Sequence, residues 1–392
     1  MARQAGWFRG RLRHALSTTL ISELLQPEEN AEAAPRVLVA YERDYRGEIA
    51  SVAAGTAPGH RLFGLTELMR QGWSVTTVRA AGEPGQRRWH YSQDRVVWRL
   101  ALVAAAWASS TRGQVVFATT EASALPLLLA RRLRLIDQPV VFVAIALTST
   151  NQTTGLRYWL WRLAIVESQV ILTYDRAQAR AARKRFPRAE VRVIPFGVDV
   201  DWLGEGGPQP RHGSSVLSVG TNEGRDFGTL VAALPDDLFL TIVTDELNAL
   251  KLRSVSERVR VRTAVPIEEL RDLYHRASML VLPLREAHQS SGQTVLLENM
   301  ACGTPIIVSD VSSVRDYVIH GQSALVVPPG DAEALRWAIT RLLSDPEIRQ
   351  ALGQNAKYAV RESWSSMRYG TSLAAILNEV KDETQLPRTD GH

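Results

Sequence analysis

The stretch that decides the fold runs from Ser290 to Asp310 and reads SSGQTVLLENMACGTPIIVSD. A polar Ser-Ser-Gly loop leads into a short apolar helix that carries one acid, Glu298. The helix breaks at Cys302-Gly303-Thr304-Pro305, and the strand Ile306–Val308 follows at once. A helix placed so tightly between apolar strands predicts one α/β unit of a parallel sheet.

Short apolar runs alternate with helical stretches over most of the chain. The runs are continuous, which is typical of parallel strands covered on both faces. The expected strands are residues 36–41, 74–78, 115–119, 140–147, 170–174, 191–196, 215–220, 238–245, 258–265, 279–284, 305–310 and 324–328. Expected helices include residues 60–72, about 331–361 and about 365–381. This alternation predicts two doubly wound, Rossmann-like α/β domains in tandem, facing a central cleft.

The chain of 392 residues is too long for one ordinary core, so two domains are expected. The stretch from Phe196 to Ser215 is rich in Gly and Pro and predicts the interdomain linker. We expect an N-terminal domain over residues 36–200, completed by a helix over 365–381 that crosses back to it. The C-terminal domain is expected over residues 201–364, with a disordered tail over 382–392. Residues 1–35 are expected to form a leader or an amphipathic helix that ends in a linker over Pro27–Pro35.

The chain carries a net charge of +5, and its arginines cluster. Anionic partners such as phosphates or an acidic membrane would suit these clusters, and a solvated helix face is the alternative. The clusters are Arg131, Arg132 and Arg134, and Arg176, Arg180, Arg183, Lys184, Arg185 and Arg188.

The N-terminal segment offers a possible membrane contact. Trp7 and Phe8, flanked by arginines, fit an interfacial anchor or a packing helix. The single cysteine excludes an intrachain disulfide. We expect a cytoplasmic protein, with peripheral association to the inner face of the cell membrane as a further expectation.

The loop Ser290-Ser291-Gly292 has the features of an anion site. Backbone N–H groups at a helix N-terminus bind anions, and glycine lets a ligand approach the backbone closely. Ser291, Gln293 and Thr294 can add side-chain donors. Glu298, one to two turns further on, is placed to accept hydrogen bonds from a pair of sugar hydroxyls. Together these features describe a site for a nucleoside diphosphate; the alternative makes Ser291 a helix cap and Glu298 a surface acid.

Residues 279–352 resemble the donor-binding half of the GT-B retaining glycosyltransferases, specifically the large GT4-like family (glycosyl transferases group 1). The similar residues include GQTVLLENMACGTPIIVSD (292–310) and PPGDAEAL (328–335). VIPFGVD (193–199) is similar to the family's interdomain segment, and LSVGTNEGRDFGTLVAAL (217–234) to its first C-terminal strand, loop and helix. GHRLFGLTELMRQGWSV (59–75) resembles the first helix of its N-terminal domain. The resemblance covers most of residues 36–381.

The resemblance implies a transferase that moves a sugar from a nucleotide-diphosphate donor, with retention of anomeric configuration. The acceptor would be lipid-linked, a polysaccharide or a small molecule. Glu298 falls on the glutamate that holds the donor ribose, and Arg225 on the basic residue that contacts the diphosphate; both are catalytic candidates. The donor-binding candidates are Gly220, Thr221, Asn222, Arg225, Glu286, His288, Ser290, Ser291, Gly292, Gln293, Thr294 and Glu298. No metal cluster is visible in the sequence, so neither a metal nor a cofactor beyond the sugar nucleotide is expected.

The sequence departs from the family pattern in the donor loop and in the N-terminal half. The glutamate that the family carries eight residues before Glu298 is Ser290 here, so Glu286 or His288 replaces it or the sugar is held differently. The usual Gly-Arg after the first C-terminal strand is Gly220-Thr221. The histidine of the family is missing from residues 144–152, where Thr148, Ser149 and Asn151 are the polar candidates.

The segment after the first strand, ERDYRGEIASVAAGTAPGHR (42–61), is about twenty residues long. A loop of this length in a compact domain is usually functional or disordered. It leaves the carboxyl end of a strand and should therefore border the cleft and shape the acceptor site. The acceptor candidates are Glu42, Arg46, His60 and Thr148, and solvated charges are the alternative.

Two other functions compete with a glycosyltransferase. A sugar-nucleotide epimerase of the same architecture would need acids and a histidine in the cleft, and few are present. A catalytically degenerate nucleotide-sugar binder or partner subunit would explain the missing family residues. Nucleic acid is not an expected partner, because the arginine clusters come without a recognised nucleic-acid module or interleaved aromatics.

Overall fold

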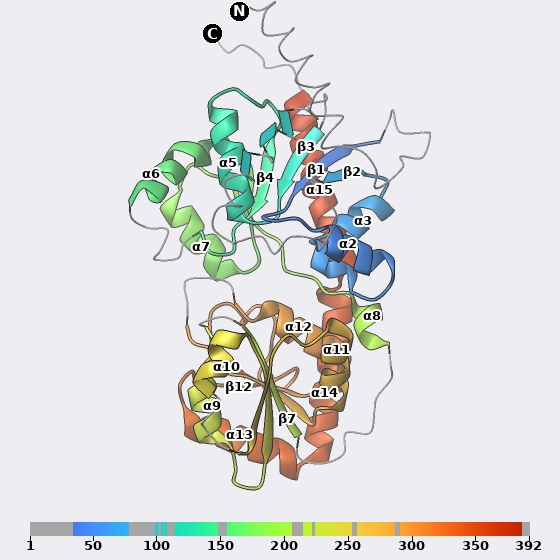
Figure 1. Cartoon of the computed structure of the whole chain (residues 1–392), viewed down its shortest axis with the longest axis vertical. Helices are drawn as coiled ribbons and strands as arrows, with labels where there is room; N and C mark the ends of the chain where they lie inside the picture. Colours follow the sequence, from blue (N-terminus) through green and yellow to red (C-terminus); the bar gives the residue numbers. More distant parts are fainter. Residues whose placement is uncertain are drawn as a thin grey trace, which may run out of the picture.

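The computed structural model describes residues 34–77, 99–100, 103–104, 106–107, 114–147, 155–205, 215–221, 224–252, 257–286 and 291–385. Within this part of the chain, two α/β domains lie end to end (Figure 1). Six predicted site residues lie outside it, namely Thr148, Ser149, Asn151, Asn222, His288 and Ser290. Most of the predicted leader and the last seven residues of the predicted tail also lie outside it.

The described residues of the N-terminal domain form a six-stranded parallel sheet in the order β2-β1-β3-β4-β5-β6. Its strands are β1 (Arg36–Ala40), β2 (Ser74–Thr77), β3 (Gln114–Ala118), β4 (Val140–Val143), β5 (Ser168–Thr173) and β6 (Val191–Val193). Its helices are α2 (Arg46–Ala53), η1 (Gly59–Leu62), α3 (Leu65–Arg70), α5 (Glu121–Arg132), α6 (Gly155–Ala164), η3 (Ile165–Glu167) and α7 (Arg176–Arg185). Every residue of β3 and β4 is buried, because helices cover both faces of the sheet.

The described residues of the C-terminal domain form a second six-stranded parallel sheet, in the order β12-β11-β10-β7-β8-β9. Its strands are β7 (Ser215–Val219), β8 (Phe239–Val243), β9 (Val259–Arg262), β10 (Met279–Leu282), β11 (Ile306–Ser309) and β12 (Leu325–Val327). Its helices are α8 (Val200–Gly204), α9 (Phe227–Ala233), α10 (Glu246–Leu252), α11 (Ile267–Arg276), α12 (Gln293–Cys302), α13 (Ala332–Ser344) and α14 (Pro346–Ser363). The predicted pair of doubly wound domains is confirmed.

Each sheet has a point at which the strand order reverses. In the C-terminal domain this point lies between β7 and β10, and in the N-terminal domain between β1 and β3. Loops that leave adjacent strands at such a point diverge to opposite faces and open a crevice at the carboxyl edge of the sheet. The loops after β7, β10 and β1 are therefore the segments expected to bind ligands.

The chain crosses between the domains twice, and the two crossings lie side by side. The N–H of Val198 donates to the carbonyl of Trp364 at 2.9 Å, and the N–H of Ser366 donates to the carbonyl of Val198 at 2.7 Å. The last helix, α15 (Ser366–Gln385), then packs on α3 and ends in the N-terminal domain (Figure 1). The predicted return of this helix is confirmed, although it runs to Gln385 rather than stopping near residue 381.

Three local expectations were wrong. The predicted linker over Phe196–Ser215 is not irregular throughout, because the Asp199 side chain caps helix α8, whose Trp202 is buried. The segment 42–61 is not a plain loop, because it holds helix α2 and the short helix η1. The helix expected over residues 60–72 is broken at Phe63 and Gly64, which both have positive φ.

Candidate functional site

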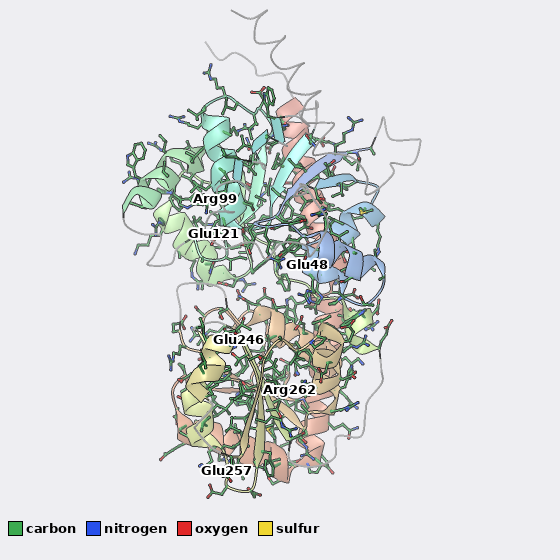
Figure 2. The ribbon with its side chains drawn as sticks, viewed as in Figure 1. Glu48, Arg99, Glu121, Glu246, Glu257 and Arg262 are labelled. Atoms are coloured by element: carbon green, nitrogen blue, oxygen red, sulfur yellow. The ribbon has the colours of Figure 1, made fainter. Side chains whose placement is uncertain are left out.

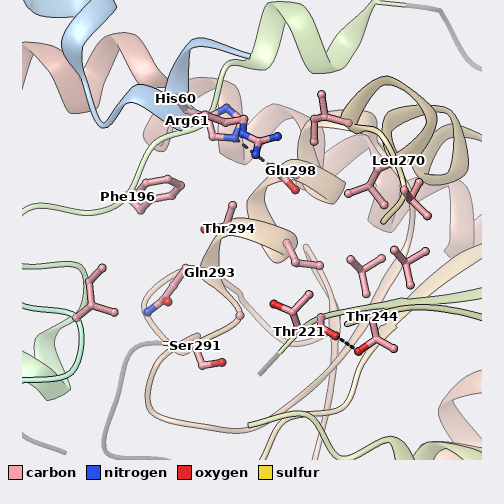
Figure 3. Close-up of a pocket in the computed structure, with 18 of the residues that line it drawn as sticks. His60, Arg61, Phe196, Thr221, Thr244, Leu270, Ser291, Gln293, Thr294 and Glu298 are labelled. Atoms are coloured by element: carbon pink, nitrogen blue, oxygen red, sulfur yellow. Dashed lines mark hydrogen bonds and ion pairs between the residues drawn. The ribbon is translucent and has the colours of Figure 1, made fainter. Parts of the chain in front are cut away.

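A cavity of about 620 Å³ lies where the two sheets face each other (Figure 3). Its walls come from residues just after the carboxyl ends of strands in both domains, among them Ile145 after β4, Tyr174 after β5, Gly220 after β7 and Thr244 after β8. Its position is therefore the one that two facing doubly wound sheets predict for a ligand.

The C-terminal wall is built around the start of helix α12. Gly292 is its N-cap with φ of 92°, and a Cβ there would lie 2.9 Å from the side chain of Leu284. Only glycine fits this left-handed, crowded position. The loop therefore turns sharply enough to present Ser291 and Thr294 to the cavity. The first N–H groups of any helix lack partners within it, so this helix end can bind an anion.

Arg225 also lines the cavity and is buried, with 7% of its surface exposed. Its Nε donates to the carbonyl of Val219 at 2.9 Å, and its Nη1 donates to Oγ of Ser291 at 3.2 Å. Neither partner is a carboxylate. Burial lowers the pKa of Arg225 to about 10, so the guanidinium remains charged at neutral pH. The site thus holds a desolvated positive charge beside the helix end.

Gly220 is required by the position of Arg225. A Cβ on Gly220 would lie 1.9 Å from Nε of Arg225 and 2.6 Å from its Cζ. The hydroxyl of Thr244 donates to the carbonyl of Gly220 at 2.6 Å and holds the loop in place. Thr221, the next residue, also lines the cavity. The predicted residues Gly220, Thr221 and Arg225 are therefore brought together with Ser291.

Glu298 lies further along α12, and both of its carboxylate oxygens accept hydrogen bonds. Nε2 of His60, from the N-terminal domain, is 3.1 Å from Oε1, and the hydroxyl of Tyr274 donates to Oε2 at 3.1 Å. All three residues are buried. Burial raises the pKa of Tyr274, and the neighbouring Glu298 charge adds to this, so the phenol stays a hydrogen-bond donor. Figure 3 shows His60 and Arg61 pointing toward Glu298 across the domain boundary.

The side chain of Gln293 does not act as the free donor that the sequence suggested. Its amide nitrogen donates to Oδ2 of Asp175 in the N-terminal domain at 3.2 Å and to the carbonyl of Ser313 at 2.9 Å. Both N–H groups of the side chain are thereby used. Gln293 lines the cavity, but its amide holds the two domains together.

The structure does not bring Glu286, Glu42 or Arg46 into the cavity wall. Glu286 lies at the surface and accepts hydrogen bonds from the backbone and hydroxyl of Ser312. Arg46 begins helix α2 and pairs with Asp44 at 2.8 Å. Because a helix replaces the expected loop, Arg43, Tyr45 and Glu48 line the cavity instead.

Sequence reasoning missed Tyr274 and Asp199. Tyr274 is one apolar position of an amphipathic helix, and nothing in its spacing marks it as a partner of Glu298. Asp199 accepts the N–H of Gly59 at 2.9 Å and donates its own N–H to Nδ1 of His60 at 3.0 Å. An aspartate before an expected helix is a capping signal, which could have located it.

The family of glycosyl transferases group 1 matches residues 225–345, which contain Arg225, the loop at Ser291 and all of α12. Over this segment the chain is similar to that family. The two facing domains and the solved structures that resemble them show the GT-B fold. The predicted resemblance to this family and the predicted GT-B fold are confirmed.

Curated relatives match over part of their length. The chain is 35% identical over 130 residues to D-inositol 3-phosphate glycosyltransferase of Thermobispora bispora, covering 33% of this chain and 28% of that relative. It is 27% identical over 259 residues to glycogen synthase of Mycobacterium tuberculosis, covering 61% of each. The matches therefore span less than two thirds of these glycosyltransferases.

Solved structures resemble this chain over most of its length. Sucrose-phosphate synthase from Thermosynechococcus elongatus has a TM-score of 0.68 at 19% identity, covering 89% of this chain and all of that one. HepE of Anabaena in complex with UDP-glucose also has a TM-score of 0.68, at 14% identity, covering 88% of this chain and 99% of that one. At these identities the likeness concerns the fold.

Proposed function

We propose that the protein is a retaining glycosyltransferase of the GT4-like type that takes its sugar from a nucleoside diphosphate sugar. The observation that carries the proposal is the buried, charged Arg225 beside the start of α12, with the buried carboxylate of Glu298 further along the same helix. A cation and a helix end suit a diphosphate, and a carboxylate suits the hydroxyls of a ribose. The solved complex of HepE with UDP-glucose supports a sugar nucleotide as the ligand class.

The same groups can assist the reaction. When the glycosidic bond of the donor breaks, negative charge grows on the departing diphosphate. Arg225 and the first amides of α12 are fixed in place before the reaction, so they stabilise this charge without reorganising. Ser291, which accepts a hydrogen bond from Arg225, holds the guanidinium toward the helix end. Independence of metals and cofactors remains a prediction.

A ligand panel tests the proposal. Purified protein is heated with UDP-, GDP-, ADP- and dTDP-sugars, and the shift in melting temperature is compared with that of Glu298→Ala. A ligand at about 100 times its Kd should stabilise the parent by about 2.7 kcal/mol. The variant should lose most of this shift because the ribose contact is gone.

Absence of any shift in the folded parent would contradict donor binding. A shift without sugar transfer to any acceptor would instead favour the degenerate nucleotide-sugar binder. Transfer is followed as release of the nucleoside diphosphate. Inversion at the anomeric carbon would overturn the retaining assignment.

We propose that the N-terminal wall of the cavity binds the acceptor. Arg43 pairs with Glu48 at 2.6 Å and lies 4.6 Å above the ring of Tyr45, which stacks on Tyr41. Glu48, on α2, lies at the end of its domain that faces the C-terminal domain (Figure 2). Arg61 adds a second arginine to the wall. Such paired charges suit the hydroxyls of a saccharide or the head group of a lipid-linked acceptor.

We further propose that the protein works at an anionic membrane surface, from a cytoplasmic location. Among the described residues, no helix is both long and apolar enough to span a bilayer. Helices α5, α6 and η3 pack together, and large apolar side chains are exposed on α6 and η3 and just after α5, namely Leu133, Leu135, Trp159 and Val166. Arg134, in the turn after α5, and Arg162, on α6, are exposed as well. Apolar side chains rimmed by arginines are typical of surfaces that bind acidic lipids.

Vesicle binding tests this surface. The parent should sediment with vesicles that contain phosphatidylglycerol and not with pure phosphatidylcholine. Trp159→Ala should weaken binding by about tenfold, because an exposed tryptophan supplies much of the apolar contact. Trp337→Ala removes a similarly exposed tryptophan, 62% against 58%, from the C-terminal domain and should have no effect. Equal binding by the parent and both variants would contradict the proposed surface.

A further inference from the structure

His60 lies at a junction of three parts of the molecule. It belongs to η1 of the N-terminal domain, its Nδ1 lies 3.0 Å from the N–H of Asp199 in the crossing segment, and its Nε2 lies 3.1 Å from Glu298 of the C-terminal domain. Only 3% of its surface is exposed. The histidine is therefore packed between the domains. A lone histidine in a loop would instead be solvated.

The contacts of His60 decide which ring nitrogen carries the proton. The backbone N–H of Asp199 can only donate, so Nδ1 accepts and carries no hydrogen. Nε2 must then be the N–H that donates to Oε1 of Glu298. Asp199 is itself held by the N–H of Gly59, which donates to its Oδ2 at 2.9 Å. The segment that joins the domains thus fixes the tautomer and the direction of this donor.

The carboxylate of Glu298 has room for two more hydrogen bonds. An ionised carboxylate accepts at about four lone-pair positions. His60 uses one on Oε1, and Tyr274 uses one on Oε2. Each oxygen keeps one position, and Glu298 lines the cavity. Two acceptor positions of the carboxylate therefore remain, one for each of the two vicinal hydroxyls of a ribose.

We infer that His60 is a positioning residue for ribose recognition: it orients Glu298 from the opposite domain, so that the ribose is read fully only when the domains are closed. The inference rests on the proposed donor site. Tyr274 fixes Oε2 from within the C-terminal domain in any arrangement, because α11 packs on α12. His60 reaches Oε1 only across the domain boundary. Selectivity for ribose over 2′-deoxyribose is therefore tied to closure.

The test compares ribose and deoxyribose nucleotides. Dissociation constants are measured for UDP, GDP and ADP, each paired with its 2′-deoxy form, on the parent and on His60→Phe. The parent should prefer the ribose form of the nucleotide that it binds by about tenfold or more, as expected for a hydrogen bond to a charged group. His60→Phe keeps a ring of similar size but donates nothing, so the preference should fall by at least about threefold.

Three further variants separate orientation from structural damage. His60→Gln retains an N–H donor and should restore most of the preference. Asp316→Ala removes another hydrogen bond between the domains, from the N–H of Arg176 at 2.7 Å, outside the cavity wall. This variant should change the affinities for the ribose and the deoxyribose nucleotide alike, so that their ratio stays the same. In a Glu298→Ala background, His60→Phe should have no further effect on the ratio.

The outcomes are distinguishable. If the parent binds none of the diphosphates, the proposed donor site fails and the inference fails with it. If the parent prefers ribose and His60→Phe keeps that preference, the donor site stands and the role of His60 is wrong. That role is equally wrong if Asp316→Ala lowers the ratio as much as His60→Phe, because loose domains alone would then explain the loss.

Discussion

Arg225→Met is expected to weaken the binding of a nucleoside diphosphate by about a hundredfold, because it removes a buried partner of a charged ligand. The variant should nevertheless leave the free protein within about 1 kcal/mol of the parent in unfolding free energy. At neutral pH the guanidinium is charged in both the folded and the unfolded chain, so its burial penalty is fully present. Burial lowers its pKa to about 10, which corresponds to a penalty on the order of 3 kcal/mol. The variant gains stability because this penalty disappears. Loss of the hydrogen bonds to Val219 and Ser291 offsets about 2 kcal/mol of that gain.

Calorimetric titration and denaturant unfolding measure the two quantities. Arg336→Met removes an exposed arginine of the same domain, outside the cavity wall, and should bind the diphosphate as the parent does. Gly220→Ala offers a second approach, because its Cβ would displace the guanidinium while the charge remains; it should weaken binding at least about tenfold. Gly228→Ala, with only Asp226 at 3.8 Å, is its matched control. Unchanged affinity in Arg225→Met would remove the main support for the donor site.

Gly197→Ala is expected to destabilise the protein by about 3 kcal/mol, at the upper end of the cost of overpacking. A Cβ at this position would lie 2.4 Å from the carbonyl oxygen and 2.8 Å from the carbonyl carbon of Ser365. Those atoms belong to the second crossing between the domains, and backbone atoms cannot rotate away as a side chain can. The neighbouring hydrogen bonds of Val198 with Trp364 and Ser366 would stretch or break.

Thermal unfolding measures this effect, and a fall in melting temperature of about 5 °C is expected. Gly204→Ala is the control, because its Cβ would meet only the end of the Lys357 side chain at 3.9 Å. If both variants melt within about 1 °C of the parent, the two crossings are not packed as tightly as the contact between Gly197 and Ser365 implies.

The α/β class, the two domains and the helix start at the proposed donor site could all be predicted from the sequence. Continuous apolar runs separated by helical segments suffice for parallel sheets, because such strands are buried on both faces whatever surrounds them. The loop at Ser291 and Gly292 could likewise be interpreted locally, since a glycine before a helix determines both the turn and the exposed amides. Glu298 was a candidate from its place one to two turns into the helix, whereas Arg225 was found through resemblance to the family; the structure places both at one cavity.

Only the tertiary structure decided how these residues are paired. His60 and Glu298 are 238 positions apart, and Gln293 and Asp175 are 118 apart. No local pattern of hydrophobicity or capping encodes such contacts, because they depend on how two separate domains meet. The acceptor candidates could not be predicted for the same reason. Around helix α2, the residues that line the cavity are Arg43, Tyr45 and Glu48. The predicted residues Glu42 and Arg46 do not line it. Chain periodicity defines each domain, whereas the packing of one domain against the other defines the site.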